Sequence, residues 1–229
     1  MKEKIIETSQ IMLFLRENPG IFSDFEKECL MNYVKSNRTH GKFVPDMVRE
    51  IYDELGLLRE DQDIYTGFMD LLQSEFDIRE RKILEVGGGV IPRLGKRISS
   101  IQTGEGKITV YDPRLSKYVQ DTERMKLVRK PFTSTTKLRD TNFMLAFMPC
   151  EAAETFIDAA TENKIDFMLA LCEGGPHGDE YDYFESDEEW LDSMVYRAKR
   201  GVKDNGMGTL GIQYLKKYED PYPVIYNHR

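Results

Sequence analysis

Three consecutive glycines follow a short apolar run in the stretch ILEVGGGVIPRLG, residues 83–95. Glycine has no Cβ and adopts positive φ freely, so Gly87, Gly88 and Gly89 allow the backbone to approach a bound molecule closely. A helix that begins after Pro92 would direct its free N–H groups back towards this turn. The pattern predicts a site for a nucleotide-type molecule, although a tight turn without a ligand has the same composition.

A carboxylate follows at the position that nucleoside binding requires. The next apolar run, KITVYD, ends at Asp112. In an open α/β sheet, ligands bind beyond the carboxyl ends of the strands, where a carboxylate can accept hydrogen bonds from both ribose hydroxyls. Because Pro113 follows, Asp112 could also be a turn former. The glycine turn and Asp112 together form a more specific signal than either alone.

The residue at position 92 narrows the choice of nucleoside. The dinucleotide fingerprint GxGxxG needs a third glycine where this chain has Pro92, which disfavours an NAD- or FAD-dependent oxidoreductase. The stretch instead resembles motif I of the class I S-adenosylmethionine-dependent methyltransferases, roughly E/D-x-G-x-G, with Glu85, Gly87 and Gly89 at the three defined positions. Residues 143–154 are similar to that family's post-strand-four motif, and residues 208–228 resemble its terminal strand pair.

The resemblance covers about Arg81 to Arg229 and implies a seven-stranded sheet that binds S-adenosyl-L-methionine. It implies that Glu85 lies near the methionine ammonium and that Gly87, Gly88 and Gly89 lie under the cofactor. It assigns the ribose to Asp112 and places Pro149 beside the cofactor, after the fourth strand.

Two loops are expected to face the reactive end of the cofactor. One contains Pro149, Cys150 and Glu151, and Glu151 is a candidate for orienting a substrate amine, or else a favourable charge at a helix start. The other, residues 172–183, contains His177, a candidate general base because its ordinary pKa lies near neutrality, or else a surface histidine. Its acidic residues have no fixed ligand spacing, so no metal site is predicted.

The chemistry of methyl transfer leaves the acceptor open. The sulfonium is a good leaving group, so catalysis would come mainly from proximity and orientation, and no catalytic triad is needed. We expect a small-molecule acceptor. Two alternatives stay open: aminopropyl transfer from the same cofactor, as in the loosely similar nicotianamine synthases, and a non-catalytic module that has kept the fold.

The elements that must position these residues alternate from position 81 onward. Short apolar runs separated by helical patterns predict a mostly parallel Rossmann-like sheet with helices on both faces. Before position 81 the pattern is helical, with stretches at 23–36, 44–58 and 64–76. We therefore expect a helical N-terminal region, 1–80, serving as lid, substrate platform or dimerisation element, and a cofactor-binding domain, 81–229.

The composition of the chain limits which partners and which cellular setting we expect. The 229 residues carry a net charge of −8, which makes general nucleic-acid binding unlikely, because phosphate neutralisation needs clustered Lys and Arg. The three cysteines lack CxxC spacing, which indicates reduced thiols, a cytoplasmic setting and no zinc framework. No apolar run approaches the roughly 20 residues that span a bilayer, and the start is not typical of a signal peptide. A homodimer is possible.

Overall fold

The structure is a computed structural model that describes residues 8–17, 27–28, 65–89, 91–115, 119–172, 184, 186–217 and 220–228. The chain divides into two compact units, one of Met1–Asp63 with Ser116–Gln120 and one of Ile64–Leu115 with Asp121–Arg229. In the first unit the structure describes a single helix, α1 (Thr8–Glu17), and a helical pair at 27–28. The helices expected at 23–36 and 44–58 lie outside the described residues.

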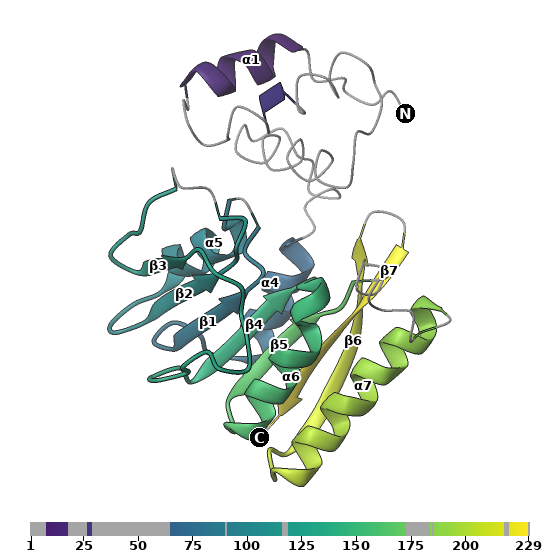
Figure 1. Cartoon of the computed structure of the whole chain (residues 1–229). Coiled ribbons are helices and arrows are strands. Elements are labelled where there is room, and N and C mark those ends of the chain that lie inside the picture. Colours follow the sequence, from purple (N-terminus) through teal and green to yellow (C-terminus); the bar gives the residue numbers. More distant parts are fainter. Residues whose placement is uncertain are drawn as a thin grey trace. The chain divides into compact units, whose positions relative to one another are not determined.

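The second unit is built on a seven-stranded sheet with strand order β3-β2-β1-β4-β5-β7-β6 (Figure 1). Strands β1 to β5 are parallel, whereas β7 is antiparallel to both β5 and β6. This confirms the predicted mostly parallel sheet with a terminal antiparallel pair. The strands are β1 (Lys82–Val86), β2 (Lys107–Tyr111), β3 (Met125–Val128), β4 (Phe143–Phe147), β5 (Asp166–Ala170), β6 (Thr209–Lys217) and β7 (Asp220–His228).

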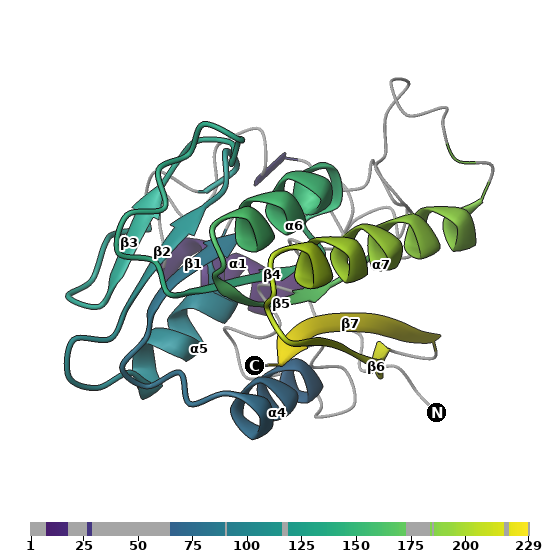
Figure 2. The ribbon, with the colours of Figure 1, turned by 90° about the horizontal axis from the view of Figure 1, so that it is seen from below.

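Helices cover both faces of this sheet, as predicted. Figure 2 shows α4 (Thr66–Glu75) and α5 (Arg93–Ile101) on one face and α6 (Ala153–Glu162) and α7 (Asp187–Asp204) on the other. Ser186 and Glu189 have the spacing of a capping box, and at the start of α7 the Glu189 N–H donates to the Ser186 hydroxyl at 3.2 Å. The connection from β3 to β4, residues 129–142, contains no helix, and its Phe132 packs edge-on against Tyr111 at the end of β2.

The core explains why the strands are nearly continuous apolar runs. Every residue of β4 and β5 is buried, because helices pack on both faces of the sheet. On the face of α6 and α7, alternate strand residues such as Leu84 and Val86 pack with Phe156 and Trp190. Within the part of the chain that the structure describes, no helix has the length and apolar character needed to cross a membrane.

Two boundaries differ from the expected ones. The unit that contains the sheet begins at Ile64 and includes α4, whereas the sequence placed the domain boundary near residue 80, so the domains 1–80 and 81–229 stay a prediction. The sequence pattern of residues 186–201 predicts a helix that ends at Gly201, and this prediction is wrong, because α7 continues to Asp204. Gly201 is needed inside the helix, where a Cβ would come within 2.7 Å of the Thr161 hydroxyl.

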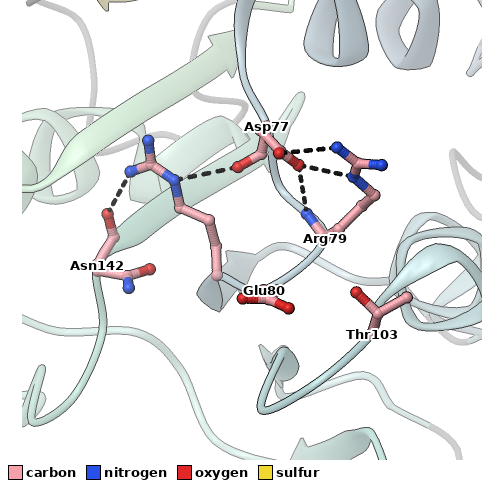
Figure 3. Close-up of a pocket in the computed structure, with 6 residues that line it drawn as sticks. Asp77, Arg79, Glu80, Thr103 and Asn142 are labelled. Atoms are coloured by element: carbon pink, nitrogen blue, oxygen red, sulfur yellow. Dashed lines mark hydrogen bonds and ion pairs between the residues drawn. The ribbon is translucent and has the colours of Figure 1, made fainter.

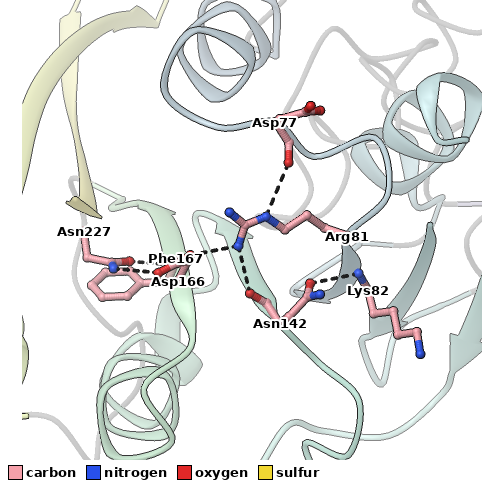
Figure 4. Close-up of polar contacts among 7 residues, drawn as sticks. All are labelled: Asp77, Arg81, Lys82, Asn142, Asp166, Phe167 and Asn227. Atoms are coloured by element: carbon pink, nitrogen blue, oxygen red, sulfur yellow. Dashed lines mark hydrogen bonds and ion pairs between the residues drawn. The ribbon is translucent and has the colours of Figure 1, made fainter. Parts of the chain in front are cut away.

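A polar network ties the amino ends of β1, β4 and β5 to the end of β7 (Figure 4). The Arg81 guanidinium donates to the Asp166 carboxylate at 2.8 Å and to the Asn142 carbonyl at 3.2 Å. The fully buried Asn227 amide donates to the other Asp166 oxygen at 3.0 Å and accepts from the Phe167 N–H at 2.6 Å. Asn227 therefore satisfies one buried donor and one largely buried carboxylate at once.

We expect Asn227→Ala to lower the free energy of unfolding by about 1–3 kcal/mol, because it removes the hydrogen bond to the buried Phe167 N–H and the one to the Asp166 carboxylate. The measurement is urea unfolding. Asn163→Ala is the matched control, because the Asn163 amide donates to the Ala159 carbonyl at an exposed helix end. The control should lose less than about 0.5 kcal/mol. Equal losses in the two variants would show that the buried hydrogen bonds of Asn227 do not contribute to the free energy of unfolding.

Candidate cofactor site

The glycine turn leaves β1 in a conformation that requires glycine at two positions. Gly87 and Gly89 have φ of 83° and 73°, in the left-handed region. The Gly87 N–H donates to the Tyr111 carbonyl at 2.9 Å, which extends the β1–β2 pairing into the turn. A Cβ on Gly87 would lie 3.2 Å from the Cα of Pro149. The turn and Pro149, both predicted to touch the cofactor, therefore lie in contact at the carboxyl ends of β1 and β4.

Asp112 joins this turn directly. One carboxylate oxygen accepts the Gly89 N–H at 2.9 Å, and the other accepts the Arg114 N–H at 2.7 Å. The Arg114 guanidinium lies 3.4 Å from the same carboxylate, which is only 3% exposed. The structure thus brings the glycine turn and Asp112 together as the sequence predicted, while the ribose-binding role of Asp112 stays a prediction.

Glu85 lies beneath the turn with its side chain directed at α5. A Cβ on Gly95 would come within 2.6 Å of one Glu85 carboxyl oxygen, and a Cβ on Gly88 within 3.8 Å of the other. The Glu85 residue is 2% exposed, and its Oε2 has no hydrogen-bond partner among the described residues. Burial, together with the negative charge of Asp112, raises the pKa of Glu85 from 4.5 to about 8.

Of the two candidate catalytic residues, the structure describes Glu151 but not His177. Glu151 is exposed in the short 3₁₀ helix η2 (Cys150–Ala152), which follows Pro149. It lies at the same edge of the sheet as the glycine turn, because Pro149 contacts Gly87. His177 and the other loop residues at 173–183 lie outside the described residues. Met148, between β4 and Pro149, has φ of 54°, a strained value for a residue with a side chain.

Sequence reasoning missed two features of this edge. Gly95 was read only as part of a helix, although a glycine inside a helical pattern can indicate close packing. Arg93, the first residue of α5, is buried and lies 5.1 Å from the ring centroid of Tyr65. The same ring lies 4.9 Å from that of Phe147, at the carboxyl end of β4. These long-range contacts leave no local pattern in the sequence.

A cavity of about 570 Å³ lies at the opposite edge of the sheet (Figure 3). Its position beside the amino ends of β1 and β4 separates it from the glycine turn. An exposed ion pair between Asp77 and Arg79, at 2.9 Å, occupies one side, and exposed pairs contribute little stability. Because the cavity lies at the amino ends of the strands, it is not the candidate cofactor site. Its lining residues are Asp77, Arg79, Glu80, Arg81, Thr103 and Asn142.

The strand order 3-2-1-4-5-7-6, with only the β7 strand reversed against β5 and β6, decides the fold. The chain has the fold of the class I S-adenosylmethionine-dependent methyltransferases. No family model and no curated protein matches the sequence. The resemblance predicted from motif I is thus confirmed at the level of the class I fold.

Solved structures agree with this fold. A protein from Lactococcus lactis, provisionally named a hemolysin, is 10% identical, with a TM-score of 0.51 over 74% of this chain and 89% of its own. A precorrin-6y C5,15-methyltransferase from Geobacter metallireducens is 14% identical, with a TM-score of 0.47 over 75% of this chain and 91% of its own. A methyltransferase from Aquifex aeolicus has 13% identity and a TM-score of 0.44 over 78% and 97%. At 10% identity the first likeness supports the fold alone, and the two lower scores add nothing to it.

We expect Gly95→Ala to destabilise the protein, against the usual gain of up to about 1 kcal/mol for replacing a helical glycine. The added methyl would lie 2.6 Å from Glu85 Oε2 and 2.9 Å from Val110 Cγ2. Gly67→Ala in α4 is the matched control, because its methyl would meet only the Leu215 side chain, at 3.8 Å. The measurement is urea unfolding of both variants. A stabilised Gly95→Ala would show that the glycine is not needed to accommodate Glu85.

We also expect the free energy of unfolding to depend on pH through Glu85. The pKa of Glu85 is raised in the folded state, so folding favours its protonated form. The contribution of Glu85 to the free energy of unfolding is therefore fully present below pH 4.5 and is lost as the pH rises to about 8. In that window stability should fall by up to about 1.4 kcal/mol per pH unit. Glu85→Gln should flatten the dependence in urea unfolding at pH 5 to 8, whereas Glu105→Gln, at an exposed position, should leave it unchanged. A wild-type profile parallel to that of Glu85→Gln would contradict this assignment.

Proposed function

We propose that the protein binds S-adenosyl-L-methionine at the carboxyl ends of β1, β2 and β4 and transfers its methyl group to a small-molecule acceptor. The observation that carries the proposal is the junction of three groups in a class I fold. The glycine turn, the Asp112 carboxylate and Pro149 come from three separate strands and lie in direct contact.

The roles within this site follow from chemistry. The backbone at Gly87, Gly88 and Gly89 would lie under the cofactor, and Asp112 would accept the ribose hydroxyls. Asp112 is already held by the Gly89 N–H and by Arg114, so it is oriented before the ligand arrives. Such preorganisation reduces the entropic cost of binding.

On the side of the methyl acceptor, catalysis would depend on how nearby residues position the acceptor. Glu151 is exposed next to Pro149, where it could orient a substrate amine, and His177 could serve as base from the loop that follows β5. The helical region within 1–80 would act as lid, substrate platform or dimerisation element. Methyl transfer itself then depends on holding the acceptor in line with the sulfonium methyl.

The first test is a calorimetric titration with S-adenosyl-L-methionine on the wild type and on Asp112→Ala. We expect micromolar binding that weakens at least tenfold in the variant, a loss of about 1.4 kcal/mol for charged hydrogen bonds to the ribose. Asp121→Asn is the matched control, because Asp121 also accepts a backbone N–H, from Leu127 at 3.0 Å, but lies before β3. The control should bind as the wild type does.

Failure of the wild type to bind up to millimolar cofactor would overturn the proposal. Where binding is found, incubation with candidate acceptors identifies the reaction from the nucleoside product. S-adenosylhomocysteine marks methyl transfer, and methylthioadenosine would instead mark aminopropyl transfer. Binding with neither product across an acceptor screen would favour a non-catalytic module.

A further inference from the structure

Two carboxyl groups are buried on the same face of the sheet, at the edge where the proposed cofactor would bind. Glu85 pairs with Val110 in the parallel register of β1 and β2, so Asp112, two residues further along β2, projects from the same face of the sheet. The Glu85 and Asp112 residues are only 2% and 3% exposed. Two carboxylates brought together out of water cannot both ionise without a large cost.

The partners of the two groups differ. Asp112 accepts backbone N–H groups from Gly89 and Arg114 and forms an ion pair with the Arg114 guanidinium at 3.4 Å. Glu85 has none of these, and its Oε2 lies buried without a partner among the described residues. Of the two, Glu85 is therefore the group with a buried carboxyl oxygen that no described residue contacts through a hydrogen bond.

The described neighbours of Glu85 are mostly apolar. The Cβ position of Gly95 on α5 lies between Glu85 Oε2, Val110 on β2 and the Met125 sulfur on β3. The turn contributes Gly88 and, close by, Pro92. Burial acts first on Glu85, and the negative charge of Asp112 acts in the same direction. These causes, burial and Asp112, place the pKa of Glu85 at about 8.

We propose that Glu85 and Asp112 act as a carboxyl pair that reads the charge of the bound nucleoside: the free protein holds one proton on Glu85 and releases it to solvent when a cationic nucleoside binds. The inference rests on the proposed function. No bond other than the Glu85 O–H breaks, and the proton passes to the buffer. A positive ligand favours the ionised carboxylate, which in turn strengthens binding of that ligand.

The pair would distinguish cofactor from product. S-adenosylmethionine carries a sulfonium charge that S-adenosylhomocysteine has lost, whereas both keep the ammonium, so the cofactor offsets a second buried negative charge more fully than the product does. The affinity for S-adenosylmethionine should then rise with pH between 6 and 8, by at most about tenfold per unit for one linked proton. The affinity for S-adenosylhomocysteine should rise less, which favours exchange of product for fresh cofactor.

The test counts protons by calorimetry of the full chain at pH 7 in phosphate and in Tris, buffers with different ionisation enthalpies. We expect release of up to about one proton when S-adenosylmethionine binds to the wild type, and a smaller release with S-adenosylhomocysteine. Glu85→Gln should bind S-adenosylmethionine without release. Glu105→Gln, which removes an exposed carboxylate, should behave as the wild type does.

The outcomes separate the inference from the function. Binding without proton release, or equal release by Glu85→Gln, overturns the carboxyl pair and leaves the cofactor assignment intact. No binding at all overturns both. Carboxyl carbon NMR of the free protein, assigned by the Glu85→Gln variant, gives a second readout independent of ligand. A Glu85 carboxyl protonated at pH 7 supports the pair, and one ionised at pH 6 refutes it.

Discussion

The hydrogen bond from the Gly89 N–H to the Asp112 carboxylate joins the two halves of the candidate site. It holds a glycine with positive φ over the end of β2, and the turn in turn lets Pro149 approach Gly87. The turn is also held at this edge by the Gly87 N–H, which donates to the Tyr111 carbonyl at 2.9 Å. The position of α5, the burial of Glu85 and the shape of the surface offered to a nucleoside all follow from where the turn is held.

Much of this arrangement could be predicted from the sequence, because its signals are local. The strands KILEV and FMLAF are short apolar runs bounded by charged or turn residues, and both lie where expected. The glycines and Asp112 were identified as one constellation because they end neighbouring strands. The terminal pair β6 and β7 was predicted from the resemblance of residues 208–228 to the family's terminal strand pair.

What could not be predicted depends on contacts across the fold. The direction of the Glu85 side chain, towards α5, is set by strand alternation and by Gly95, ten residues along the chain. The end of α7 was misplaced because Gly201 looks like a cap, whereas its role is to pack against Thr161 on α6. Arg93 and Tyr65 meet only in three dimensions. Local pattern carries none of this information.

The place of β7 in the sheet has a consequence for how the chain folds. β7 follows β6 in sequence but lies between β5 and β6, so β6 has no sheet partner until β7 is added. The same strand brings Asn227 to Asp166, 61 residues earlier, and Asp166 also pairs with Arg81, 85 residues before it. Such non-local closure is slow, because loop entropy is lost before the contacts form. During synthesis β5 therefore keeps an open edge until β7 leaves the ribosome, and unpaired strand edges are prone to misassembly.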